Sequence, residues 1–186
     1  MTDYFALLGQ PRLPWLDRAA LKEVYHTKTL QTHPDSGAEA GFTDLNEAYQ
    51  VLQDPKRRLQ HLLELHQAPL PAANQTVPAD LQELFLQIGA LTQQIQPLLE
   101  KVRAASNELS RSLLKGELLT VQKEIAGLRE TVGSMSAAAE EQLKEIDSAW
   151  RADPAGQIDA LQDLHLRFAY LGRWSEQLDE LAFQLL

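Results

Sequence analysis

Apolar residues recur at every third or fourth position along most of the chain, the spacing that places them on one face of an α-helix. In the first third, this pattern predicts a short helix over residues 3–8, a second that starts after residue 17, a third over about 42–53 and a fourth from residue 55. The residues expected to form the core of this part are Leu21, Val24, Tyr25, Leu30, Phe42, Leu45, Ala48, Tyr49 and Leu52.

The remaining chain also has helical periodicity throughout. It predicts a helix over about 79–95 that Pro97 disturbs, a long helix over about 98–132, a turn at Gly133-Ser134, a helix over about 137–151 and a last helix from Pro154 to the end. In the last helix, apolar residues alternate three and four apart, as in a helical bundle or coiled coil. Core positions expected in the long helix are Val102, Leu109, Leu113, Val121, Ile125 and Leu128.

Three prolines separate these two parts. Pro69, Pro71 and Pro78 lie in residues 67–80, and prolines break helices and favour an extended linker. The predicted fold class is therefore all-α, with one domain at residues 1–66 and a second, a bundle of three or four helices, at residues 81–186.

The amino-acid composition argues against several classes of function. The formal net charge of −9 disfavours binding to nucleic-acid phosphates, so no nucleic-acid partner is expected. The absence of cysteine excludes disulfides, thiol catalysis and cysteine–zinc sites, and the five histidines have no metal-ligand spacing. No apolar run approaches the roughly 20 residues that cross a bilayer, and no signal peptide is evident. We expect a cytoplasmic protein without a cofactor, metal or membrane contact, and not an enzyme.

The tripeptide His33-Pro34-Asp35 lies between the second and third predicted helices, at the head of a polar loop. Alone it is an ordinary turn, because proline and aspartate are common turn residues. Together with Asp3-Tyr4-Phe5, Asn46-Glu47-Ala48-Tyr49 and Asp54-Pro55 it resembles a J-domain, over residues 2–60. This resemblance implies an antiparallel helical hairpin, braced by shorter helices, that presents the tripeptide at its tip.

The stretch from Arg58 to His66 resembles the end of the J-domain in co-chaperones of the HscB type, and residues 166–181 resemble their last helix. The family resemblance implies docking on a DnaK- or HscA-type chaperone and stimulation of its ATPase. The residues it nominates for this contact are His33, Pro34, Asp35, Lys22, His26 and Lys28. Thr32, Gln31 and Lys28 depart from the family pattern. Gln31 stands where a basic residue is common, so the second helix is expected to be less basic than usual.

The same resemblance implies that the C-terminal domain binds an IscU-like scaffold protein on which iron–sulfur clusters are built. It nominates Leu84, Phe85, Ile88 and Phe168, with buried core as the alternative for each. The carboxylates of the family's patch are missing, because Gly89, Thr92 and Gln96 occupy those positions. Two other functions therefore stay open: a J-domain protein that serves a different client, and a helical adaptor that activates no chaperone.

Overall fold

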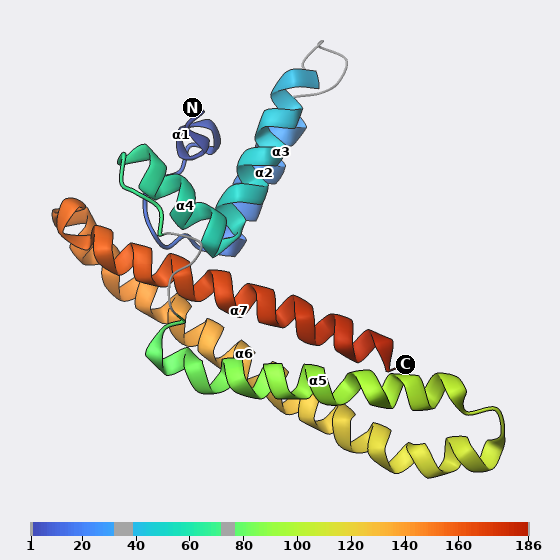
Figure 1. Ribbon diagram of the computed structural model, residues 1–186. Helices are drawn as coiled ribbons and strands as arrows, with labels where there is room; N and C mark the ends of the chain where they lie inside the picture. Colours follow the sequence, from blue (N-terminus) through green and yellow to red (C-terminus); the bar gives the residue numbers. More distant parts are fainter. Residues whose placement is uncertain (1, 32–38, 72–76, 186) are drawn as a thin grey trace. The chain divides into compact units, whose positions relative to one another are not determined.

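The computed structural model describes residues 2–31, 39–71 and 77–185, and every regular element among them is helical (Figure 1). The all-α prediction is confirmed. None of the described helices combines the length and apolar composition that crossing a membrane requires. The elements are α1 (Tyr4–Leu8), α2 (Arg18–Gln31), α3 (Glu39–Gln53), α4 (Pro55–Leu65), η2 (Ala79–Leu81), α5 (Gln82–Ala104), α6 (Glu108–Ala152), η3 (Ala155–Gln157) and α7 (Ile158–Gln184).

Aspartates start the short helices of the N-terminal part. The Asp3 carboxylate accepts the Ala6 N–H at 3.2 Å, and the Asp54 carboxylate accepts the Arg57 N–H at 2.8 Å. Each bond satisfies a donor that has no partner within the helix. Gly9 ends α1 in the left-handed region with φ 66°, which glycine adopts without steric cost.

The helix breaks predicted at Pro97 and at Gly133-Ser134 are wrong. Pro97 lies inside α5, and α6 runs unbroken through Gly133-Ser134. The break falls instead just before Glu108, where Asn107 caps α6 by accepting the Ser110 N–H at 2.8 Å. A glycine within a helix costs only about 1 kcal/mol relative to alanine. Buried side chains on both sides of Gly133, at Val132 and Ala139, keep α6 continuous.

Several residues predicted as core are exposed. The exposed fraction of the side chain is 64% for Leu30, 48% for Phe42, 72% for Leu109 and 73% for Leu113. Val102 is also at the surface. These residues continue the periodicity of their helices and lie towards helix ends. Periodicity identifies a face of a helix and not what packs on it.

Contacts divide the chain into two compact units. Unit 1 takes in residues 1–73 and 139–168, and unit 2 takes in residues 74–138 and 169–186. The predicted division at residues 67–80 keeps 139–168 with the C-terminal domain, whereas these units group that segment with the N-terminal residues. Independent folding of residues 1–66 stays a prediction.

Each unit has its own hydrophobic core. In unit 1, side chains of α1–α4 pack with Leu143, Trp150 and Leu161. In unit 2, the core is a seam of apolar side chains from η2, α5, α6 and α7, among them Leu84, Ile88, Ile95, Val121, Ile125, Trp174 and Leu178.

Candidate functional site

Helices α2 and α3 form the hairpin on which the chaperone-binding residues were predicted. The Tyr25 ring of α2 stacks on the Tyr49 ring of α3, with centroids 4.3 Å apart and planes 14° from parallel. The Tyr25 hydroxyl also donates a hydrogen bond to Asn46 Oδ1 at 3.4 Å. Asn46 and Tyr49 belong to the sequence stretch that resembles a J-domain, and their contacts join the two arms of the hairpin.

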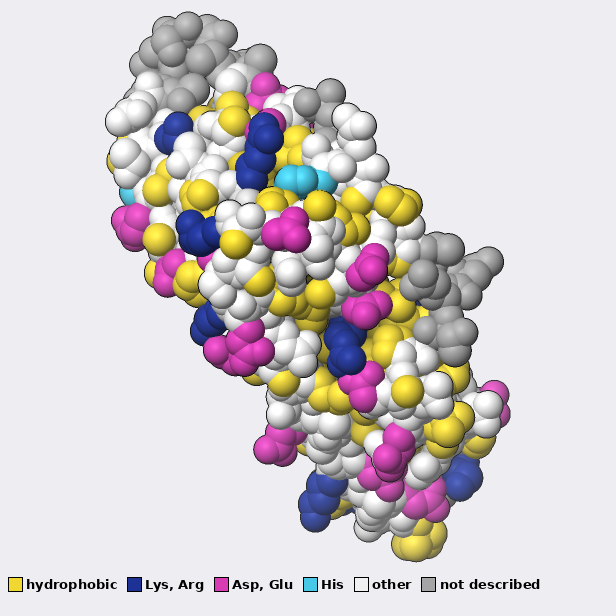
Figure 2. All heavy atoms as spheres, turned by 90° about the vertical axis from the view of Figure 1, so that its left-hand side faces the viewer, with side chains coloured by type: hydrophobic (Ala, Val, Ile, Leu, Met, Phe, Trp, Pro, Cys, Tyr) yellow, Lys and Arg dark blue, Asp and Glu magenta, His cyan; other side chains and the backbone are white. Residues whose placement is uncertain are grey.

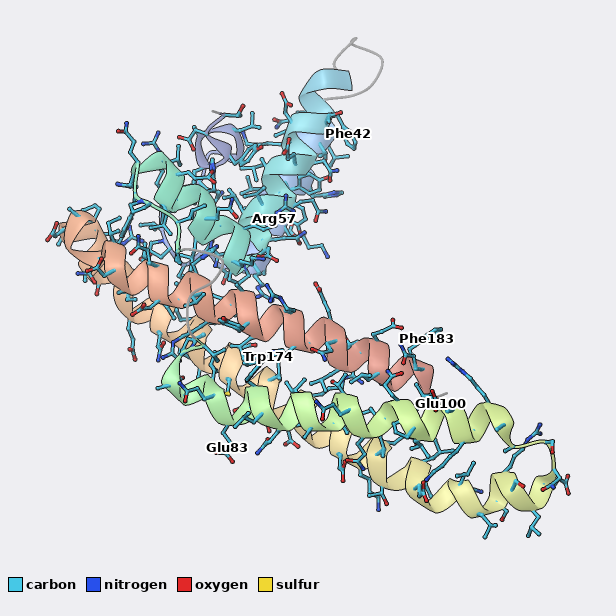
Figure 3. The ribbon with its side chains drawn as sticks, in the orientation of Figure 1. Phe42, Arg57, Glu83, Glu100, Trp174 and Phe183 are labelled. Atoms are coloured by element: carbon cyan, nitrogen blue, oxygen red, sulfur yellow. The ribbon has the colours of Figure 1, made fainter. Side chains whose placement is uncertain are left out.

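The tripeptide His33-Pro34-Asp35 lies outside the described residues. The ends of the hairpin arms are described: α2 ends at Gln31 and α3 begins at Glu39. Exposed apolar side chains lie on both arms near these ends: Leu30 on α2, and Phe42 on α3, which Figure 3 labels. Both were assigned to the core from periodicity, and the sequence holds no signal that marks them as surface residues.

The basic residues predicted on α2 have different surroundings. Lys22 and His26 are exposed. Lys28 is half-buried, and its Nζ lies 3.9 Å from the position that a Cβ at Gly9 would occupy, over the end of α1. Lys22 and His26 are therefore available to a partner, while Lys28 also packs against its own unit.

The base of the hairpin is held by a buried arginine. Arg58 of α4 is 2% exposed and donates to the Pro14 carbonyl at 2.8 Å and to the Leu52 carbonyl at 2.6 Å. Burial lowers the pKa of Arg58 to about 10, so the guanidinium stays charged at neutral pH. These bonds join α4 to the end of α3 and to the loop before α2.

His61 makes a second buried polar contact. Its Nε2 accepts the Tyr4 N–H at 3.1 Å, and its ring stacks on Phe5 with centroids 5.7 Å apart. Burial lowers the pKa of His61, which favours the neutral ring that can accept this bond. Both Arg58 and His61 come from the stretch that resembles HscB-type proteins, and the structure gives them positioning roles rather than a place on a surface.

Asp3 and Tyr4 strengthen the attachment of α1. Partial burial opposes ionisation of Asp3, but hydrogen bonds from Ala6 N–H and from Arg12, whose guanidinium lies 2.6 Å away, lower its pKa. Burial and a hydrogen bond to Glu47 raise the pKa of Tyr4. The Trp150 indole N–H donates to the Arg12 carbonyl at 3.0 Å, so residues 139–168 help to fix the same loop.

The residues predicted for scaffold binding do not form one exposed patch. Leu84 and Ile88 are buried in the core of unit 2, which is the alternative that the sequence left open. Phe168 is buried in the core of unit 1. Phe85 is 48% exposed.

Phe85 borders an aromatic cluster that periodicity did not predict. Its ring lies 6.4 Å from that of Trp174 on α7, which Figure 3 labels. The Trp174 ring lies 5.5 Å from that of Tyr170. Two turns further along α5, Thr92 Oγ1 accepts a hydrogen bond from the Gln177 amide at 2.9 Å. We call the surface formed by Phe85, Gly89 and Thr92 of α5 with Tyr170 and Gln177 of α7 the client face.

No three His, Asp or Glu side chains in the described ranges are placed to hold a metal ion together. Figure 2 shows acidic, basic and apolar side chains interspersed on the face in view. Exposed residues of the α2–α3 hairpin and of the client face are accessible to partners.

Comparisons with known proteins agree with this arrangement. The family model for the DnaJ domain matches residues 3–61. The co-chaperone protein HscB homolog of Cupriavidus taiwanensis is 33% identical over 181 residues, covering 87% of this chain and 96% of that protein. The homolog of Ralstonia nicotianae is 32% identical over 178 residues, with 86% and 96% coverage.

A solved structure has the same fold. Chaperone HscB from Vibrio cholerae aligns over 100% of both chains with a TM-score of 0.64 at 20% sequence identity. At this identity the likeness concerns the fold alone. Because the chain matches almost the whole length of relatives that are about one-third identical to it, it belongs to the HscB family of J-domain co-chaperones.

Proposed function

We propose that this co-chaperone docks on a DnaK- or HscA-type chaperone through the α2–α3 hairpin and stimulates its ATPase. The observation that supports this most directly is the exposure of Lys22 and His26 on α2, the arm that leads to His33-Pro34-Asp35. The Lys22 ammonium attracts an acidic partner surface and accelerates encounter, and the His26 imidazole one turn away can hydrogen-bond to the same surface. Leu30 and Phe42 add exposed apolar surface at the same end of the hairpin.

The test is single-turnover ATP hydrolysis by the partner chaperone, with and without this protein. We expect His33→Gln to abolish the stimulation and Lys22→Ala to reduce it several-fold. Arg57→Ala is the matched control for charge, because Arg57 is exposed on α4 (Figure 3). Normal stimulation by the His33→Gln variant would contradict the docking role. Absence of stimulation by the parent protein would favour an adaptor that activates no chaperone.

For the client face, we propose that it binds an IscU-like iron–sulfur scaffold protein and delivers it to the chaperone. Phe85 is the exposed anchor of this contact. Leu84 and Ile88 are buried in the core of unit 2 and support the helix that carries Phe85. Phe168 is buried in the core of unit 1 and does not touch the scaffold. Gly89, Thr92 and Gln96 add no charge, so the contact is apolar and hydrogen-bonded rather than ionic. A J-domain protein for a different client is the second candidate, because these positions lack carboxylates.

Calorimetric titration with the scaffold protein tests this assignment. Phe85→Ser removes an interface anchor, a change that typically costs about 2 kcal/mol or more, and so weakens binding by roughly 30-fold. Phe183→Ser is the matched control, because Phe183 is 71% exposed near the end of α7 (Figure 3). Unchanged affinity in the Phe85→Ser variant would place the client site elsewhere. Failure of the parent protein to bind this scaffold would favour another client.

A further inference from the structure

The exposed surface of α5 carries no charge over most of its length. Residues 84–99 include no Asp, Glu, Lys, Arg or His, although charged residues make up 23% of the chain. Their exposed positions are Phe85, Leu86, Gln87, Gly89, Ala90, Gln93, Gln94, Gln96 and Pro97. Exposed positions of α7, in contrast, include Asp159, Asp163, Arg173, Glu176, Asp179 and Glu180. The core of a protein–protein interface is depleted in charged residues, so this part of α5 has the composition of an interface.

Leu86 lies on this surface and has no role in the function proposed above. Its exposed fraction is 68%, against 48% for Phe85. It lies about 100° around α5 from Phe85, whose ring is near that of Trp174 at the client face. The client face therefore does not include Leu86. A large apolar side chain that stays exposed beside an anchor residue indicates that the contact extends over it.

Gly89 leaves an opening between these two side chains. It lies one turn after them, about 40° around the helix from Phe85 and about 60° from Leu86, in the interval between the two. Helical side chains point back toward the N-terminus, so a side chain at position 89 would cover the space between Phe85 and Leu86. Glycine has no side chain, and a Cβ built on Gly89 meets no atom within 4 Å. We call this opening, with Phe85 and Leu86 on its sides and Gly89 at its base, the α5 notch.

The polar group beside the α5 notch is already bonded within unit 2. The Thr92 hydroxyl donates to the Ile88 carbonyl at 2.7 Å and accepts from the Gln177 amide at 2.9 Å. Its proton is therefore not available to a client. A polar client group placed between Phe85 and Leu86 would lose water without gaining a hydrogen bond, which is unfavourable. The notch fits an apolar side chain instead.

We propose that the client inserts a large apolar side chain, of the size of leucine, methionine or phenylalanine, into the α5 notch, and that Leu86 is a second anchor beside Phe85. This inference rests on the client-binding role proposed above. It extends the contact from the client face across Gly89 to the solvent-exposed side of α5. The notch selects an apolar rather than a basic side chain, because residues 84–99 supply no carboxylate to pair with a basic one.

Calorimetric titration with the IscU-like scaffold protein tests both parts of the proposal. We expect Leu86→Ser to weaken binding by about ten-fold, because it removes one side of the notch. Leu113→Ser is the matched control, since Leu113 is 73% exposed on α6 and should leave the affinity unchanged. Gly89→Gln should also weaken binding by about ten-fold, because its side chain fills the notch. Gly133→Gln on α6, where a Cβ also meets nothing within 4 Å, should not.

A double variant tests whether one client side chain contacts both residues. Once Leu86→Ser has removed one side of the notch, filling the notch with Gly89→Gln should cost less affinity than it does in the parent. The double variant should therefore lose clearly less than the about hundred-fold that two independent effects would give. Circular dichroism checks that every variant stays helical, which is expected because Leu86 and Gly89 are exposed and glycine is a weak helix former.

The outcomes separate this proposal from the function on which it rests. Parental affinity in Leu86→Ser, together with weaker binding by Phe85→Ser, would overturn the second anchor and leave the client face in place. Parental affinity in Gly89→Gln, or fully additive losses in the double variant, would overturn the insertion of one side chain into the notch. A parent protein that does not bind the scaffold would overturn the proposed client together with the notch as its contact.

Discussion

Units 1 and 2 are stabilised by different kinds of contact. The buried polar side chains of the described residues, Arg58 and His61, both belong to unit 1, where they bond to backbone groups of the loop before α2, the end of α3 and the start of α1. The core of unit 2 is a seam of apolar side chains. Unit 1 therefore combines an apolar core with a few directional buried bonds, whereas unit 2 depends on apolar burial.

This difference follows from what each unit contains. Unit 1 includes an irregular segment between α1 and α2 whose carbonyl groups need donors, and Arg58 and Trp150 supply them. Unit 2 is built from helices that satisfy their own backbone groups over most of their length. Substitutions of buried polar groups should therefore affect unit 1 alone, while unit 2 should tolerate changes at its surface.

The two phenylalanines of the predicted scaffold patch should differ most in their effect on the free energy of unfolding. We expect Phe168→Ser to destabilise unit 1 by about 3–5 kcal/mol, because Phe168 is buried in its core. Phe85→Ser should change stability by less than about 1 kcal/mol, because Phe85 is half-exposed. Denaturant unfolding of the two variants measures both values. Equal destabilisation would mean that Phe85 is also a core residue.

Arg58→Leu should destabilise unit 1 by roughly 2–3 kcal/mol. Leucine retains much of the apolar volume, but the Pro14 and Leu52 carbonyls lose a charged donor in a buried place. The neighbouring Arg57→Leu provides the control, since Arg57 is exposed and should change stability by less than about 0.5 kcal/mol. Similar melting temperatures for the two variants would show that the buried bonds contribute little.

Gly133→Ala should stabilise α6 by about 0.5–1 kcal/mol. The residue is within the helix, and the added methyl group meets no atom within 4 Å, so the gain in helix propensity meets no steric cost. Thermal unfolding of this variant against the parent measures the effect. A lower melting temperature would indicate that a bend at Gly133 is part of the native state.

Acidification should weaken unit 1 more than unit 2. Burial lowers the pKa of both His61 and His165, and Lys56 lowers that of His165 further. As the pH falls below about 6.5, the histidines of the unfolded chain bind protons that those of the folded unit do not. Their contribution to the free energy of unfolding is therefore complete above this pH and is lost as the pH falls below it. Unit 2 contains no histidine.

Melting at pH 7.5 and pH 5.5 measures this dependence, with Trp150 fluorescence reporting on unit 1 and Trp174 fluorescence on unit 2 in single-tryptophan variants. His165→Leu should reduce the loss seen by Trp150, because both ring nitrogens of His165 are buried without a hydrogen-bond partner among the described residues. An equal loss of stability in both units would exclude these histidines as the cause.

The helical class and the start of several helices follow from the sequence alone. Asp3, Asp54 and Pro55 act within one turn of chain, so their effect needs no distant partner. Motif spacing likewise identified the J-domain and its family, and Asn46 and Tyr49 join α2 to α3 as a hairpin requires.

Only tertiary structure decided which face of each helix is covered. Leu30, Leu109 and Leu113 have the periodicity of core residues, yet their side chains are exposed. Gly133 has the local preference of a turn, but packing on either side keeps α6 continuous. Local signals act over a few residues, whereas burial depends on side chains from elsewhere in the chain. Phe168, for example, packs with the N-terminal residues in unit 1, while Phe85 stays at the surface.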